Sequence, residues 1–152
     1  MEEFIVTSIG FGLVVSLLFS EIFGIAAGGM VVPGYFALYL NHPLVIVTTL
    51  LVAYLSYALV RTFSSFMIIY GRRRTVLMII TGFMLGGLLR QFTQAYIADS
   101  SIELNVIGYI IPGLIAIWID RQGFIETVSV LSIASVIVRL GLIILNGGDL
   151  LP

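Results

Sequence analysis

Residues 29–40 read Gly29-Met-Val-Val-Pro-Gly-Tyr-Phe-Ala-Leu-Tyr-Leu40, an uncharged apolar run with a Pro-Gly pair inside it. The pattern returns later as Gly108-Tyr-Ile-Ile-Pro-Gly-Leu-Ile-Ala-Ile-Trp-Ile119. Proline lacks a backbone N–H and clashes with the preceding helical turn. We therefore expect each copy to break its helix inside the protein, either as a broken span or as a re-entrant segment.

The residues after each Pro-Gly pair also repeat. Each copy continues into a polar break and then a long apolar stretch, which carries Arg61 in the first copy and Arg139 in the second. The two arginines lie at nearly the same distance after their Pro-Gly pairs. We predict a single membrane domain over residues 1–152, built from one repeat at about 4–71 and a second at about 75–146.

Composition sets the class of protein. The chain has 152 residues, of which 60% are hydrophobic and 10% charged, and its mean hydropathy is +1.17. A soluble domain of this length needs more polar surface, so we predict an all-α integral membrane protein with long transmembrane helices. The absence of cysteine excludes a disulfide framework and thiolate chemistry. The acidic residues Glu2 and Glu3 stand where a signal peptide has its basic region, so we expect no cleavable leader.

Two topologies account for the apolar runs. If each Pro-Gly segment crosses the membrane, six spans form a three-plus-three inverted repeat with both termini outside. If each segment is re-entrant, four full spans form a two-plus-two parallel repeat with both termini inside. The arginine distribution favours six spans, whereas the shortness of the apolar run over residues 107–119 favours four. Both alternatives place the adjacent arginines 72–74 on the cytoplasmic side.

Enzyme motifs are missing from the sequence. It has no Walker loop, and the only histidine, His42, stands beside Pro43 in an expected turn. We therefore expect no catalytic residue, metal site or cofactor in this chain, and no nucleic-acid partner.

The Pro-Gly pairs have two interpretations. Each pair can be a kink that improves helix packing. Alternatively, the two pairs together form a broken-helix site, where freed backbone groups meet a substrate near the membrane midplane. The repetition of the pair favours the second interpretation, but both stay open at this point.

Several arginines lie in or near apolar runs. A charge at membrane depth costs about 3 kcal/mol or more, so such a residue pairs, snorkels or serves a function. Arg90 is close to a helix end and can snorkel. Arg139 lies deeper, and Glu21 or Glu126 is its expected partner. The triplet Arg72, Arg73 and Arg74 is expected to contact lipid phosphate or a cytoplasmic partner.

Four motifs carry a resemblance to a known family. They are Ser20-Glu21-Ile-Phe-Gly24, Gly29-Met-Val-Val-Pro-Gly-Tyr35, Phe66-Met-Ile-Ile-Tyr-Gly-Arg-Arg73 and Ile110-Ile-Pro-Gly-Leu-Ile-Ala116. With these motifs the chain resembles, over essentially its whole length, the C subunit of bacterial poly-γ-glutamate synthesis, the PgsC/CapC family.

The resemblance implies a non-catalytic, multi-pass subunit in the bacterial plasma membrane. It would act with an ATP-dependent amide ligase, the B component of the complex, and with an extracytoplasmic A component. Copies of the chain itself are a further candidate partner. Such a complex joins glutamates through their γ-carboxyls and delivers the polyanion outside, as capsule or slime. Two alternatives stay open: an autonomous small transporter or channel, and a purely structural anchor for the ligase.

The polymer is a polyanion, which gives the arginines and the Pro-Gly pairs a candidate task. We expect the two Pro-Gly segments to face each other and to line the polymer's route. The polymer-path candidates are Arg61, Arg90, Arg139, Glu21, Pro33, Gly34, Pro112 and Gly113.

The topology predicts an accessibility difference. Because the chain has no native cysteine, single cysteines can be introduced at position 100 and at position 73. A membrane-impermeant thiol reagent should label Ser100→Cys in intact cells and Arg73→Cys only after permeabilisation. Labelling of Ser100→Cys only after permeabilisation would overturn the orientation.

Overall fold

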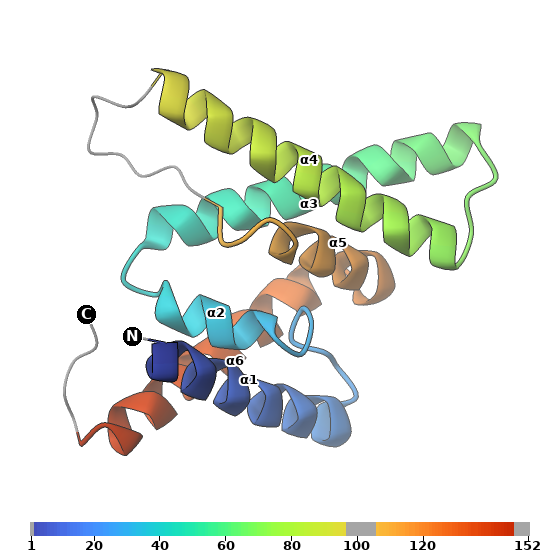
Figure 1. Cartoon of the computed structure of the whole chain (residues 1–152). Helices are drawn as coiled ribbons and strands as arrows, with labels where there is room; N and C mark the ends of the chain where they lie inside the picture. The colour runs from blue at the N-terminus through green and yellow to red at the C-terminus, as the bar shows by residue number, and fades with distance from the viewer. Residues whose placement is uncertain (1, 97–105, 148–152) are drawn as a thin grey trace.

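The computed structural model describes residues 2–96 and 106–147. This part of the chain is all-helical, with no strand. In chain order its helices are α1 (Glu2–Phe23), α2 (Val32–Leu38), α3 (Pro43–Phe66), α4 (Arg72–Tyr96), α5 (Ile111–Gln122) and α6 (Phe124–Leu145) (Figure 1). Within the described residues, the four helices α1, α3, α4 and α6 are long and apolar enough to cross a membrane. The predicted all-α membrane class is confirmed.

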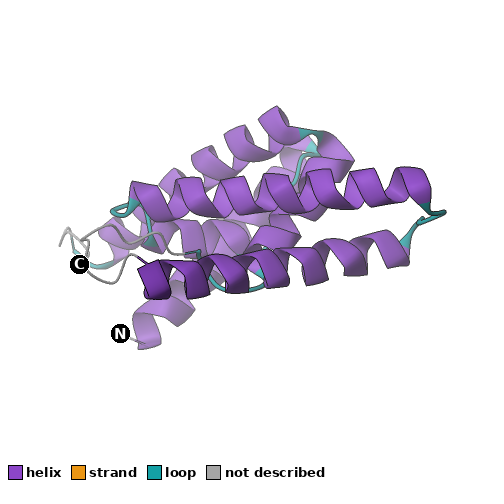
Figure 2. Ribbon diagram, turned by 90° about the horizontal axis from the view of Figure 1, so that it is seen from above, coloured by secondary structure: helices purple, strands orange, loops and turns teal. Residues whose placement is uncertain are grey.

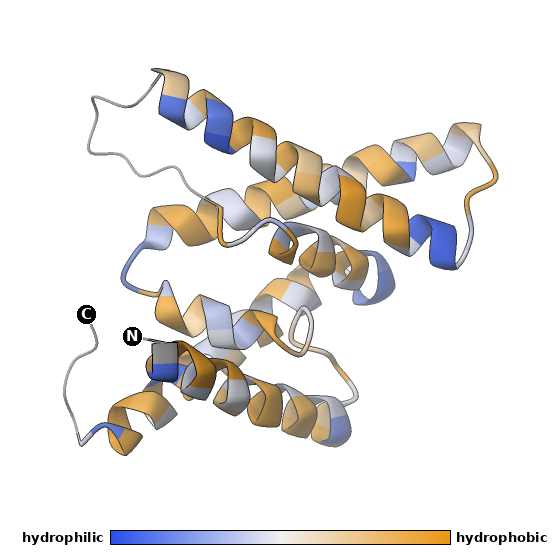
Figure 3. Ribbon diagram, viewed as in Figure 1, coloured by the Kyte–Doolittle hydropathy of each residue, from blue (hydrophilic) through white to orange (hydrophobic). Residues whose placement is uncertain are grey.

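The outer surface of the long helices is apolar. Val6 is 69% exposed, Ile125 74% and Ile144 78%, and Figure 3 shows hydrophobic residues along the outside of these helices. A soluble monomer does not expose apolar area on this scale. The surface therefore suits lipid, which takes the place of water around the bundle.

The two short helices form the centre of the molecule. Most of α2 is buried, and so is most of α5, while the long helices pack around them. Pro33 and Pro112 stand in the first turn of their helices, where a missing N–H costs nothing. Each proline thus begins a helix after an irregular stretch, over residues 24–31 and 106–110, so each Pro-Gly segment is a broken one.

The helices alternate in direction. Figure 1 shows α1, α3 and α5 running one way along the bundle and α2, α4 and α6 running the other way, and Figure 2 shows the bundle of helices from above. The segment between α1 and α3 therefore passes from one end of the bundle to the other and does not return to the end at which it began. This alternation is what the six-span alternative expects, and it makes the two halves run in opposite directions. Four of the described helices are long enough to cross a membrane, so the number of spans stays a prediction.

Corresponding contacts occur in the two halves. Helix α1 packs on α2 as α4 packs on α5, and α6 packs on α2 as α3 packs on α5. A methyl carbon added at Gly12 would lie 2.7 Å from Gly34 Cα, and one added at Gly82 would lie 2.7 Å from Gly113 Cα. Each Pro-Gly helix thus touches a long helix of its own half backbone to backbone. The repeat boundaries themselves remain predictions.

The polar stretch over residues 91–105 is described only in its first part. Residues 91–96 continue α4 as its last turns. The helix continues because no glycine or proline interrupts residues 88–96. The remaining positions, including Asp99 and Glu103, lie outside the described residues.

The glycine contacts predict a stability difference. A side chain at Gly12 would force α1 away from α2, so we expect Gly12→Ala to lower the free energy of unfolding by about 1–3 kcal/mol. Gly82→Ala should do the same between α4 and α5. Unfolding of the detergent-purified protein, followed by circular dichroism, measures the change.

Gly10 provides a matched control on the same helix. A methyl carbon added there meets nothing within 4 Å. We expect Gly10→Ala to keep or slightly raise stability, since alanine favours a helix by about 1 kcal/mol over glycine. Equal unfolding curves for the Gly10 and Gly12 variants would show that the close contact is dispensable.

Candidate functional site

The Pro-Gly pairs lie in tightly packed helix contacts. A methyl carbon added at Gly34 would lie 2.8 Å from Ser8 O, and one added at Gly113 would lie 2.9 Å from Met78 O. Pro33 and Pro112 are buried next to these glycines. The observed contacts are those of helix packing, and a substrate route beside these residues stays a proposal.

Hydroxyl side chains from the long helices form hydrogen bonds with backbone groups of α2 and of the irregular stretches before α2 and α5. Ser16 Oγ donates to the carbonyl oxygen of Gly29 at 3.3 Å, and Ser8 Oγ donates to that of Gly34 at 2.9 Å. In the irregular stretch before α5, the N–H of Ile107 donates to Thr49 Oγ1 of α3 at 3.0 Å. The Gly29 carbonyl, in the irregular stretch before Pro33, is thus bonded within the protein. These buried hydroxyls were not singled out from the sequence. The feature that could have identified them is a small polar residue inside an apolar run.

Gln122 ties the two halves together at the end of the bundle where α1 ends. Its Nε2 donates to the carbonyl oxygen of Ala26 at 2.6 Å, and its Oε1 accepts from the N–H of the same residue at 3.2 Å. Nε2 also donates to Thr127 Oγ1 at 3.2 Å. One amide thereby holds the irregular segment before α2 against the junction of α5 and α6.

Arg139 holds the end of α2. Its guanidinium donates to the carbonyl oxygen of Ala37 at 2.9 Å and to Asn41 Oδ1 at 2.8 Å. The prediction that Glu21 or Glu126 pairs with Arg139 is therefore wrong. They stand near the opposite end of the bundle, in the last turn of α1 and the first turn of α6. Arg139 instead meets carbonyl and amide oxygens at a helix C-terminus, where a cation is favoured.

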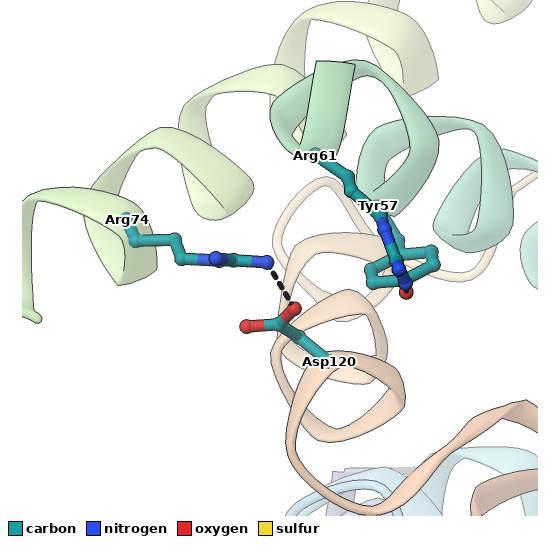
Figure 4. Close-up of polar contacts among 4 residues, drawn as sticks. All are labelled: Tyr57, Arg61, Arg74 and Asp120. Carbon is teal, nitrogen blue, oxygen red and sulfur yellow. Dashed lines mark hydrogen bonds and ion pairs between the residues drawn. The ribbon is translucent and has the colours of Figure 1, made fainter. Parts of the chain in front are cut away.

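The end of α5 is held in a similar way. Arg74, in the first turn of α4, forms an ion pair with Asp120 (Figure 4). Asp120 follows Gly113 at the same distance as Asn41 follows Gly34. Each Pro-Gly helix thus ends near an acceptor side chain that an arginine of a long helix binds. Asp120 was not singled out from the sequence, and its position relative to Gly113 is the signal that identifies it.

The other candidate arginines contact tyrosines or are exposed. Arg61 bonds to Tyr57 OH one turn earlier on α3 and lies over that ring at 5.7 Å. Arg90 donates to Tyr109 OH at 2.9 Å and lies over its ring at 5.2 Å. Glu21, Arg72 and Arg73 are exposed near the end of the bundle where α1 ends and α4 begins.

The structure does not gather the polymer-path candidates into one site. Arg61 lies toward the end of the bundle where α3 ends, whereas Arg139 contacts Asn41 just before α3 begins. They therefore occupy opposite ends and not a common midplane. No group of three or more histidine, cysteine, aspartate or glutamate side chains that could hold a metal ion occurs among the described residues.

Arg139 gives a test that separates a structural role from a polymer contact. Arg139→Leu removes two hydrogen bonds to α2 and its following turn, so we expect it to lower the free energy of unfolding by about 2 kcal/mol. Arg139→Lys keeps the charge but loses the planar fork, and it should show a smaller loss. Unfolding in detergent measures both changes.

Arg61→Leu is the matched control, because Arg61 bonds only within its own helix turn among the contacts described for it. Its effect on unfolding should be smaller than that of Arg139→Leu. If Arg139→Leu unfolds like the wild type while polymer output stops, Arg139 serves the polymer and not the packing of α2.

Comparisons with known proteins identify the family. The family model described as Capsule biosynthesis CapC matches residues 11–128. The chain is 43% identical over 117 residues to the "PGA biosynthesis protein CapC" of Bacillus subtilis (strain 168), covering 76% of this chain and 78% of that protein. It is 42% identical over 118 residues to the "Capsule biosynthesis protein CapC" of Bacillus anthracis, covering 77% of this chain and 78% of that protein. No solved structure matches the chain. The chain therefore belongs to the CapC family of capsule biosynthesis proteins.

Proposed function

We propose that this chain is the non-catalytic membrane subunit of a poly-γ-glutamate synthase and export complex. The observation that carries the proposal is the similarity to two relatives named for PGA and capsule biosynthesis, over more than three quarters of the chain. The four long apolar helices of the described residues fit a subunit that stays in the membrane. Its work is to assemble with an ATP-dependent amide ligase, the B component, and with an extracytoplasmic A component.

The charge distribution supports one orientation in the bacterial plasma membrane. Arg72, Arg73 and Arg74 begin α4, and Arg121 lies in the last turn of α5. Figure 1 shows both of these helix ends at the same end of the bundle. Arginine-rich ends favour the cytoplasm, which is where a ligase finds ATP. The start of α1, with Glu3, then faces outside.

A role in passing the polymer is supported by the opposed halves and by arginines at both ends of the bundle. Secondary transporters are often built from oppositely oriented repeats with broken helices. Positive charge at both ends attracts a polyanion. The proposed path residues remain Arg61, Arg90, Arg139, Glu21, Pro33, Gly34, Pro112 and Gly113.

The same opposed halves favour one alternative, an autonomous small transporter or channel. The two functions differ in their partners, since a transporter needs no ligase. Purification of the tagged chain from its native membrane distinguishes them. We expect a ligase to co-purify and, with ATP and glutamate, to make γ-linked polymer. Purification of the chain alone, together with unchanged polymer output in cells lacking it, would contradict the proposal.

The exposed arginines predict which surface the ligase contacts. We expect the double variant Arg72→Ala/Arg73→Ala to recover several-fold less ligase, because two charges are lost from the face that a cytoplasmic partner approaches. Arg74 stays in place because its ion pair with Asp120 holds α4 to α5. Quantitative co-purification measures the loss.

The control is Arg72→Lys/Arg73→Lys, which keeps both charges and should recover close to the wild-type amount of ligase. If the alanine variant keeps its topology and recovers as much ligase as the wild type, these arginines are lipid contacts and not a docking surface.

A further inference from the structure

A cavity of about 390 Å³ lies between the first turn of α4 and the last turns of α5. Its volume falls within the range of small-molecule sites in proteins. The residues that line it are Gly71, Arg72, Arg74, Thr75, Met78, Ile117, Asp120 and Arg121.

The charges around this cavity favour an anion. Three arginines, Arg72, Arg74 and Arg121, line it together with one acidic residue, Asp120. The cavity also adjoins the N-terminus of α4, a helix of 25 residues, whose dipole adds positive potential. The positive side chains come from two helices, so the cluster depends on the packing of α4 against α5 and is not a feature of one turn.

The ion pair inside the cavity leaves donors of Arg74 unused. Arg74 contacts Asp120 through one nitrogen and one oxygen, and its Nε is buried without a hydrogen-bond partner among the described residues. Guanidinium binds carboxylate most strongly through two parallel hydrogen bonds. The ion pair with Asp120 therefore uses only part of the hydrogen-bonding capacity of the Arg74 guanidinium. A second carboxylate can compete with Asp120 for this guanidinium.

An optical reporter, Trp118, contacts one of the arginines that line the cavity. The guanidinium of Arg121 lies over the ring of Trp118 at 5.3 Å, and Trp118 is the only tryptophan in the chain. An anion bound by Arg121 would draw the guanidinium from its place over the ring. Trp118 fluorescence therefore reports binding without a label.

We propose that this cavity binds a carboxylate of a γ-linked glutamate chain, and that Asp120 holds Arg74 in place when the cavity is empty. The anionic class follows from the charges that line the cavity, whereas the choice of γ-linked glutamate rests on the proposed function. The cavity lies at the arginine-rich end of the bundle, where a chain made by a cytoplasmic ligase would arrive.

The test uses the full chain purified in a neutral detergent and titrated with a γ-linked glutamate oligomer. We expect a saturable change in Trp118 fluorescence, and calorimetry supplies a second readout that does not depend on tryptophan. Loss of one charge-assisted hydrogen bond should weaken binding about tenfold or more in Arg74→Gln and in Arg121→Gln. Asp120→Asn should bind more tightly than the wild type, because it removes the competing carboxylate.

Arg73→Gln is the matched control. It lies between Arg72 and Arg74 and loses the same charge, but it lines a different, largely apolar cavity. Its affinity for the oligomer should stay within about twofold of the wild type, since one exposed charge contributes little. If Arg73→Gln weakens binding as much as Arg74→Gln, the oligomer senses only overall charge and the assigned site is wrong.

Lipid is tested in a separate arm with vesicles. Zwitterionic vesicles should leave Trp118 free to respond to the oligomer, and anionic phosphatidylglycerol should compete only weakly. If phosphatidylglycerol alone produces the full change and the oligomer cannot displace it, the cavity is a headgroup site and the proposal is overturned. The chain could fail to bind the oligomer while cells still need it for polymer output. That result would overturn this site and leave the proposed function intact.

Discussion

The structure depends on backbone-to-backbone contact at two glycine pairs, Gly12 with Gly34 and Gly82 with Gly113. Lipid is as apolar as leucine, so helices in a membrane gain little from burying apolar side chains against one another. Close approach of backbones supplies the packing instead. Because both members of each pair lack a side chain, a short Pro-Gly helix can lie directly against a long helix and occupy the centre of the bundle.

That central position creates a demand for hydrogen bonds. The irregular stretches before α2 and α5 carry backbone groups that lipid cannot satisfy. Ser16, Thr49 and Gln122 supply partners for Gly29, Ile107 and Ala26. Polar side chains on neighbouring elements therefore stabilise the irregular, glycine-containing stretch that precedes each Pro-Gly pair.

The general class and the broken segments could be predicted, because composition and the repeated Pro-Gly pattern are local features of the chain. The partners of Arg139 could not, because Ala37 and Asn41 meet it only after α6 has packed on α2. The charge pattern suggested an acidic partner for Arg139, but Arg139 binds a backbone carbonyl at a helix end instead. Asp120 was missed for a related reason, since its importance appears only when its place after Gly113 is compared with that of Asn41.

The way the halves cross has a consequence for synthesis of the chain. Helix α2 packs against α6, which is translated after α3, α4 and α5, while α5 packs against α3 from the first half. Neither half contains all the neighbours of its own central helix. During insertion, α2 therefore waits with one side uncovered until translation of α6 is complete, so folding of the first half must finish after the second half has entered the membrane.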